Sequence, residues 1–337
     1  MDDEVVVVMV PFPGQARRVV VVHDFLMSYK VQDFSSFPNI ESYIFLCTSS
    51  FDMYCSHKCR VAGMPIPLEE EQLKKLPSLK GCYPDDIFVH LGAFQTQYIS
   101  LSTGDIYNTS QVVEVHKTRN NGQSDLQNEY CLDWLNKQPP KSVLYVSFGT
   151  TTSFSGEQIK ELAMGLELSK QNFIWVLRDA DEVDNSGKSK KLKLPEGFEE
   201  RAKGVGLVVR EWAPQPEILA HPSTGRFLSH CGWNSCIESI TLVVPIATWP
   251  MHYDQPKNGF LVTEILKIGL AVREWEKRDE LITASAIENV VRKLMTSEEG
   301  DVIRNKAKEL GEAVRQSTQK GGAARMELES FIAHITR

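Results

Sequence analysis

Residues 226–238 read RFLSHCGWNSCIE, and this stretch decides the fold. Its first residues are typical of a buried strand, its glycine is typical of a turn, and its remaining residues are typical of a helix. We expect Asn234 or Ser235 to open that helix, because Ser235 and Glu238 match the S-x-x-E capping box. A strand, a tight turn and a helix N-terminus favour an anion site, since unpaired backbone N–H groups point outward there. His230 adds a further donor.

A second strand with a polar end lies at residues 142–152, SVLYVSFGTTT. Its Gly149, Thr150 and Thr152 offer further donors, and ligands of parallel sheets bind at the carboxyl ends of strands. The two sets of donors converge only if both strands share one sheet edge, which their spacing leaves open. These residues could instead have purely structural roles. An S-x-x-E motif is most often only a helix cap, and a lone histidine or tryptophan is most often a core residue.

The chain alternates strand-like and helix-like segments, which predicts βα units, a parallel sheet and an α/β fold. Its 337 residues suit two domains. A polar loop and a Pro-Pro break at 117–140 mark the boundary, so we predict domains at 1–140 and 141–337. The predicted strands are 5–10, 19–22, 41–47, 142–147, 173–177, 206–209, 225–229 and 244–248. The predicted helices are 91–101, 130–137, 155–169, 215–220, 234–241, 256–266, 283–295 and 299–336, the last broken at Gly321-Gly322.

Composition and charge exclude several classes of protein. The 37 lysines and arginines against 44 aspartates and glutamates give a net charge of −7, which disfavours a nucleic-acid surface. The apolar runs are too short for a membrane span, and the first run follows Asp2, Asp3 and Glu4, the wrong charge for a signal peptide. Seven cysteines without a C-x-x-C pair suit a reduced compartment, so we expect a cytoplasmic protein.

Residues 212–255 resemble the signature box of plant UDP-sugar-dependent glycosyltransferases. The matching motifs, in order, are WAPQ (212–215), ILAHP (218–222), FLSHCGWNS (227–235), ES (238–239), WP (249–250) and DQ (254–255). The wider sequence is similar in particular to the zeatin O-glucosyltransferases. That similarity rests on the phrases VVVVMVPFPGQ, VVHDFLMS, SVLYVSFGTTTS, FIWVLRDAD and WPMHYDQPKN. It covers nearly the whole chain and is weak over residues 48–128.

The resemblance implies a GT-B fold, in which two Rossmann-like domains face each other and the C-terminal one binds the UDP-sugar. For the nucleoside, it implies that Trp212 stacks on uracil, Gln215 pairs with the uracil edge and Glu238 accepts from the ribose hydroxyls. For the diphosphate and the sugar, it implies contacts from Gly149, Thr150, Thr152, His230, Asn234 and Ser235, then from Trp233, Asp254 and Gln255.

The implied reaction is a single inverting displacement. A hydroxyl of a small plant metabolite, such as the cytokinin zeatin, attacks the anomeric carbon of UDP-glucose, and UDP leaves. Positioning of the two substrates lowers the entropic barrier, and His230 with the helix N-terminus stabilises the leaving diphosphate. Glucose as the donor sugar is indicated by Gln255. No metal or cofactor is implied beyond the UDP-glucose donor.

The N-terminal part departs from the family. Its members carry a histidine base just after the first strand, where this chain has Arg17. A guanidinium cannot take up a proton. Asp24 matches the aspartate that orients the base, and the βα units between these two positions are missing, which predicts a truncated N-terminal domain. His23 is a poor substitute because neighbouring strand residues face opposite sides, and a carboxylate such as that of Asp24 is a weak base.

Two hypotheses follow. The chain is either an active UDP-glucose-dependent O-glucosyltransferase or a catalytically impaired remnant that still binds the sugar nucleotide. Two departures also fall inside the box, where Val243 replaces a glycine and Tyr253 a small residue. If that glycine serves a positive φ angle or a close backbone approach, the valine costs stability. Tyr253 is expected to crowd the sugar.

Overall fold

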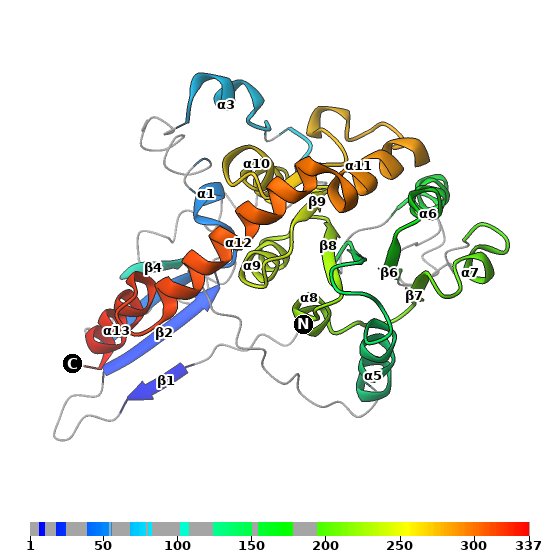
Figure 1. Ribbon diagram of the computed structural model, residues 1–337. Coiled ribbons are helices and arrows are strands. Elements are labelled where there is room, and N and C mark those ends of the chain that lie inside the picture. Colours follow the sequence, from blue (N-terminus) through cyan, green and yellow to red (C-terminus); the bar gives the residue numbers. More distant parts are fainter. Residues whose placement is uncertain are drawn as a thin grey trace, which may run out of the picture.

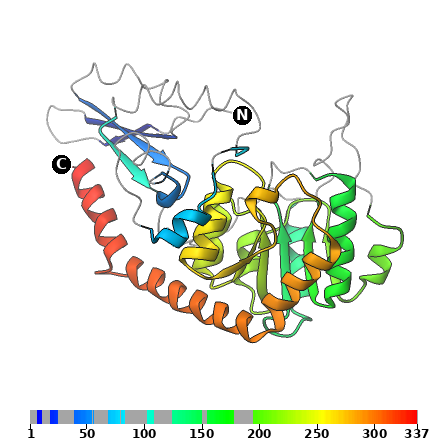
Figure 2. The same ribbon diagram turned by 90° about the horizontal axis from the view of Figure 1, so that it is seen from above.

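The computed structural model describes residues 7–10, 18–24, 39–53, 55, 68–78, 80–82, 102–107, 124–149, 154–177 and 194–336. These residues contain two sheets, one of four strands in the N-terminal part and one of six strands in the C-terminal part. Figure 1 shows helices on both sides of the larger sheet. Figure 2 shows α12 (Glu298–Thr318) and α13 (Ala323–Ile335) leading from it back to the smaller sheet.

The C-terminal sheet is parallel throughout, with the strand order β10-β9-β8-β5-β6-β7. The order reverses between β5 and β8, which is where ligands bind in open α/β sheets. The predicted parallel sheet is confirmed in this half. Its strands are β5 (Val143–Ser147), β6 (Asn172–Val176), β7 (Gly206–Val209), β8 (Thr224–Ser229), β9 (Ile246–Thr248) and β10 (Gly269–Ala271).

Both faces of this sheet are buried. Val143 and Tyr145 of β5 pack with α5 and α8 on one face, and Leu144 and Val146 pack with α6 and α11 on the other. Burial on both faces explains why these strands read as continuous apolar runs. The helical segments are α5 (Ser124–Leu135), α6 (Gly156–Ser169), α7 (Phe198–Arg201), α8 (Gln215–Ala220), α9 (Trp233–Thr241), α10 (Gln255–Phe260), the π-helix η5 (Leu261–Ile265), the 3-10 helix η6 (Trp275–Lys277) and α11 (Ala284–Thr296).

The N-terminal sheet has the order β1-β2-β3-β4, and β2, β3 and β4 are parallel. The parallel pairing of β2 and β3 was predicted, whereas β4 was missed. The prediction is wrong for β1, which runs antiparallel to β2 with Val7 opposite Val21. Only residues 11–17 join these two strands, whereas a parallel crossover needs about a dozen residues or more. The elements of this part are β1 (Val7–Val10), β2 (Arg18–Asp24), β3 (Ile40–Leu46), α1 (Ser50–Met53), α3 (Glu70–Lys75) and β4 (Gly104–Tyr107).

Three helix predictions need correction or have no counterpart here. The helix predicted at 130–137 begins already at Ser124, within the segment expected to be a loop. The helix predicted at 256–266 consists of α10 and the π-helix η5. The helix predicted at 91–101 lies outside the described residues. The break between α12 and α13 is confirmed, and Gly321 adopts a φ of 84° there.

Several contacts join the N-terminal part to the C-terminal part. At the end of the chain, α13 packs on β3, where the rings of Phe331 and Tyr43 lie 5.1 Å apart and His334 Nε2 lies 2.9 Å from the Tyr43 hydroxyl. Nearer the larger sheet, Lys257 of α10 forms a buried ion pair with Asp52 of α1 at 2.9 Å. The loop after β3 is therefore fixed against the helix that follows β9.

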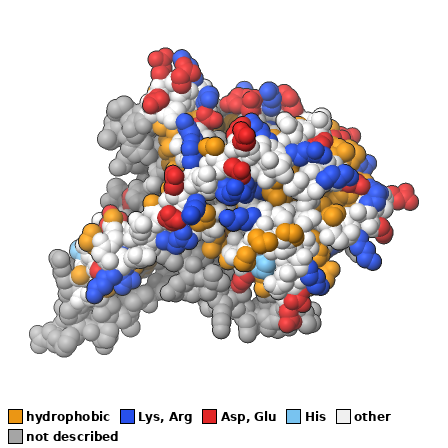
Figure 3. All heavy atoms as spheres, viewed as in Figure 1, with side chains coloured by type: hydrophobic (Ala, Val, Ile, Leu, Met, Phe, Trp, Pro, Cys, Tyr) orange, Lys and Arg blue, Asp and Glu red, His pale blue; other side chains and the backbone are white. Residues whose placement is uncertain are grey.

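The outer surface along α12 is polar. Figure 3 shows lysine and arginine side chains interspersed with acidic ones over this face, and Arg304 pairs with Asp301 at 2.6 Å. Exposed pairs of this kind contribute little stability. Among the described residues, no helix is both long enough and apolar enough to cross a membrane.

The valine that replaces glycine in the box does adopt a positive φ. Val243 has a φ of 63°, a conformation that is strained for a β-branched residue. We expect Val243→Asn to raise the free energy of unfolding by about 0.5–1 kcal/mol, because asparagine tolerates this conformation. Chemical denaturation measures the change. The control is Val205→Asn at an exposed valine without a positive φ, and an equal gain in both variants would contradict the explanation.

Candidate functional site

The two polar strand ends lie side by side. β5 and β8 are neighbours in the sheet, with Ser147 opposite Ser229, so the chain leaves both strands at the same edge. Gly149 follows β5 and His230 follows β8. The two strands therefore share one sheet edge, and Gly149 and His230 lie where the strand order reverses.

His230 is enclosed by two glycines. A Cβ atom at Gly149 would lie 2.6 Å from His230 Nε2, and so would a Cβ atom at Gly232. Gly149 also has a φ of 73°. Only glycine fits at both positions, so the ring is held between two backbone segments that both carry N–H groups.

Burial, with a smaller effect of the nearby His252, lowers the pKa of His230 to about 4, while the Ser147 backbone acts in the opposite direction. The ring is therefore neutral at pH 7 and acts on an anion as a hydrogen-bond donor rather than as a cation.

The neutral ring of His230 should make stability fall with acid. Between its ordinary pKa of 6.5 and the folded value of about 4, the unfolded chain binds more protons than the folded chain. The contribution to stability is thus complete above pH 6.5 and is lost as the pH falls toward 4. We expect the wild type to lose more stability across this range than His230→Gln, measured by denaturant unfolding at each pH. Equal slopes would show that His230 is not held neutral.

The helix after β8 begins earlier than predicted. Its N-cap is Gly232 and its first residue is Trp233, with no side-chain cap. The capping-box prediction for Ser235 and Glu238 is therefore wrong, because both lie inside the helix. The first turn of the helix adjoins His230, and Asn234 is exposed there. This arrangement suits an anion better than a capped helix does.

Ser235 and Glu238 serve a different bond. The Gln215 side-chain amide donates to Ser235 Oγ at 3.0 Å and to Glu238 Oε2 at 2.7 Å, which joins α8 to α9. Burial raises the pKa of Glu238, and the bond from Gln215 acts in the opposite direction. Just before α8, Trp212 is 58% exposed, which is unusual for so large an apolar ring. The structure thus gathers the residues predicted to bind the nucleoside along α8 and α9.

The predicted sugar-binding pair lies at the start of α10. Asp254 accepts a hydrogen bond from Asn258 at 2.8 Å, and burial, with a smaller effect of Asp52, raises its pKa to about 6. The Gln255 side-chain oxygen accepts from the backbone N–H groups of Met251 and His252, at 2.9 and 3.1 Å. The Gln255 amide nitrogen lies 3.1 Å from His252 Nδ1. The side chain of Gln255 is therefore bonded within its own turn.

Asp24 lies at the end of β2, and its carboxylate accepts a hydrogen bond from the Cys47 thiol at 3.2 Å. Burial raises the pKa of Cys47 to about 12, with smaller effects of Asp24 and Asp254. His23 is buried, and its Nδ1 lies 3.0 Å from the Asp24 carbonyl oxygen. Arg17, Thr150 and Thr152 lie outside the described residues.

Two side chains of this region were missed by the sequence reasoning. Cys47 gave no signal, since its bond to Asp24 joins two strand ends. Asn258 had one, because it stands four residues after Asp254 and residues at that spacing share a helix face.

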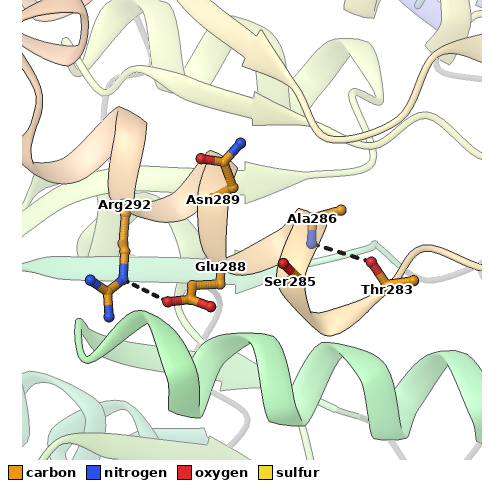
Figure 4. Close-up of a pocket in the computed structure, with 6 residues that line it drawn as sticks. All are labelled: Thr283, Ser285, Ala286, Glu288, Asn289 and Arg292. Carbon is orange, nitrogen blue, oxygen red and sulfur yellow. Dashed lines mark hydrogen bonds and ion pairs between the residues drawn. The ribbon is translucent and has the colours of Figure 1, made fainter.

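A surface hollow lies elsewhere. It measures about 530 Å³ and is formed by the outer side of α11 (Figure 4). Arg292 pairs with Glu288 at 2.9 Å, and Thr283 caps the helix by accepting from the Ala286 N–H at 3.3 Å. Arg292 also donates to the Leu168 carbonyl of α6 at 2.9 Å, and none of the residues that line this hollow is a predicted site residue, so it is not the candidate site.

Comparisons with known proteins agree with this geometry. The family profile described as "UDP-glucoronosyl and UDP-glucosyl transferase" matches residues 107–304, and the profile "Glycosyltransferase, N-terminal domain" matches residues 14–120. A zeatin O-xylosyltransferase of Phaseolus vulgaris is 48% identical over 96% of this chain and 76% of its own length. A zeatin O-glucosyltransferase of Phaseolus lunatus is 47% identical over 96% and 75%.

Solved structures show the same architecture. A UGT transferase from Siraitia grosvenorii in complex with UDP superposes with a TM-score of 0.75 at 27% identity, over 94% of this chain and 78% of that one. Phytolacca americana UGT2, complexed with UDP-2-fluoro-glucose and pterostilbene, gives a TM-score of 0.72 at 28% identity, over 94% and 76%. With the fold and the family profile in agreement, this chain is a member of the UDP-glycosyltransferase family and has the GT-B fold of that family.

Proposed function

We propose that this chain binds a UDP-sugar at the carboxyl ends of β5 and β8 and transfers the sugar to a hydroxyl of a small plant metabolite. One observation carries the proposal: His230 is enclosed by Gly149 and Gly232 beside the uncapped N-terminus of α9. Such a cradle of N–H groups suits a diphosphate. The names of the two Phaseolus relatives support a cytokinin such as zeatin as the acceptor.

In this proposal, the donor residues follow the order of the elements. Trp212 stacks on uracil, Gln215 binds the uracil edge and Glu238 the ribose. The diphosphate lies against His230, Asn234, Ser235 and the loop from Gly149 through Thr150 to Thr152. Trp233, Asp254 and Gln255 surround the sugar. Gln255 supports glucose, while one Phaseolus relative is named for xylose transfer, so both donors belong in the test.

The proposed chemistry is an inverting displacement. The acceptor oxygen forms a bond to the anomeric carbon, the bond from that carbon to the UDP oxygen breaks, and the acceptor proton leaves to a base. The neutral His230 and the N–H groups of α9 stabilise the charge that develops on UDP. The proposal includes no metal or other cofactor, and the cytoplasm is the proposed location.

A second candidate function is sugar-nucleotide binding with impaired transfer. Arg17 stands in the place of the base, and the carboxylate of Asp24 is bonded to the thiol of Cys47. The pKa of the Cys47 thiol is raised to about 12, so the thiol stays protonated at neutral pH and keeps donating to the Asp24 carboxylate. The pair therefore offers no strong base at neutral pH.

A transfer assay tests the proposal. The chain is incubated with zeatin and either UDP-glucose or UDP-xylose, and the zeatin glycoside is measured by mass spectrometry. The proposed function predicts a zeatin glycoside, and inversion predicts that its anomeric configuration is opposite to that of the donor. UDP binding without any glycoside would support the impaired alternative, whereas failure to bind UDP would reject both.

A further inference from the structure

Asn258 of α10 is fully buried, and its side-chain amide makes three hydrogen bonds. Its nitrogen donates to Asp254 Oδ2 at 2.8 Å and to the Cys231 carbonyl at 3.0 Å. Its oxygen accepts from Ser49 Oγ at 2.8 Å. Both N–H groups and the oxygen of a buried amide are thus used, as such a group requires.

The three partners of Asn258 come from separate parts of the molecule. Asp254 starts α10, Cys231 lies between His230 and Gly232, and Ser49 belongs to the loop after β3. Cys231 has a φ of 66°, a strained value for a residue other than glycine. The bond from Asn258 to its carbonyl helps to hold that strained loop, which carries His230.

The loop that holds Ser49 is itself rigidly placed. Ser49 Oγ accepts from the Asp52 N–H at 3.0 Å, and Asp52 forms the buried ion pair with Lys257. Beside them, the rings of Phe51 and Phe260 stack at 6.1 Å. The N-terminal part therefore presents the Ser49 hydroxyl to Asn258 in a fixed position.

We propose that Asn258 is a positioning residue for sugar recognition: oriented by Ser49 of the N-terminal part, it holds the Asp254 carboxylate in place relative to the His230 loop. This inference rests on the proposed function, in which Asp254 binds the sugar. It means that the N-terminal part contributes to donor recognition as well as to the acceptor side. A binding carboxylate needs such support, because small displacements of its oxygens weaken hydrogen bonds to sugar hydroxyls.

The test replaces the amide by a carboxyl group of the same shape, in Asn258→Asp. At pH 7.5 the new side chain accepts from Ser49 but donates to neither Asp254 nor Cys231. We expect the Kd of UDP-glucose to rise about 10-fold or more relative to the Kd of UDP, both measured by calorimetry on the full chain. UDP lacks the sugar, so its Kd reports only the loss of the bond to the Cys231 carbonyl in the His230 loop and is expected to rise less than the Kd of UDP-glucose.

Acid should restore binding in this variant. Near pH 5 one proton shared by the two carboxyls replaces the lost N–H donor, so the Kd ratio of UDP-glucose to UDP is expected to return to within about 3-fold of the wild type. A merely structural role predicts no such recovery. The Asn258 bond counteracts the burial that raises the pKa of Asp254. Asp52 raises the pKa of Asp254 and Lys257 lowers it. The charge of Asp254 in turn raises the pKa of the thiols of Cys47, Cys82 and Cys236.

Two further variants keep the proposal testable if Asn258→Asp folds poorly. Ser49→Ala removes the orienting hydroxyl and is expected to raise the same Kd ratio. Phe51→Leu loosens the same junction without touching the amide, and its ratio is expected to stay unchanged. An unchanged ratio in both Asn258→Asp and Ser49→Ala would overturn the inference, as would an equal rise in Phe51→Leu. A wild type that binds neither ligand would instead reject the proposed function.

Discussion

Gly149→Ala is expected to weaken UDP binding by more than about 100-fold, a loss of about 3 kcal/mol. The added Cβ would lie 2.6 Å from His230 Nε2, and the backbone at this position has a φ of 73°. The backbone after β5 or the His230 ring must therefore move. The ring has little room on its other side, because it lies equally close to Gly232, where a Cβ would also be 2.6 Å from Nε2. The backbone N–H groups and the His230 imidazole then no longer converge on the proposed position of the UDP diphosphate.

The control for this substitution is Gly156→Ala at the start of α6. A Cβ atom there would meet nothing within 4 Å, and the residue is not at a positive φ. UDP affinity, measured by calorimetry, is expected to match that of the wild type. If Gly149→Ala bound UDP as tightly as Gly156→Ala does, the loop after β5 would not belong to the site.

Transfer to zeatin is expected to be about 10²–10⁴-fold slower than in a relative that keeps the histidine base, because a general base contributes about that much. Asp24→Asn should lower the remaining rate by a further 10-fold or so, since it removes the carboxylate at the end of β2. Kinetics with UDP-glucose under saturating donor measure both effects. UDP affinity should not change, because Asp24 belongs to the N-terminal sheet.

The matched control is Asp105→Asn, which removes an exposed carboxylate from β4 of the same sheet. Its rate is expected to equal that of the wild type. A wild-type rate typical of the relatives would show that the lost histidine has been replaced. Equal rates in Asp24→Asn and the wild type would show that the substitute is not Asp24.

The C-terminal sheet, apart from its short edge strand β10, was readable from the sequence for a physical reason. Strands buried on both faces, such as Val143–Ser147, are continuous apolar runs, and helices between them supply crossovers long enough for parallel pairing. The strand ends at Gly149 and His230 were also predicted. Their meeting was not, because it depends on β5 and β8 being neighbours, which no local pattern encodes.

The errors arose where distant groups compete with local patterns. Ser235 and Glu238 have the spacing of a capping box, but Gln215 of another helix binds both of them. The seven residues between β1 and β2 are too few for a parallel crossover. The alternating pattern of strands and helices therefore wrongly predicted parallel pairing for β1. Asn258 bonds to Asp254 and also to Ser49, which lies 209 positions away in the chain, a link that sequence spacing cannot reveal.

Calorimetric titration of the unmodified chain with UDP tests the central claim most directly, because the claim concerns the nucleotide site between β5 and β8. Saturable binding at one site per chain, accompanied by a rise in the melting temperature, is the predicted result. The absence of both a binding heat and a melting shift at millimolar UDP would contradict it.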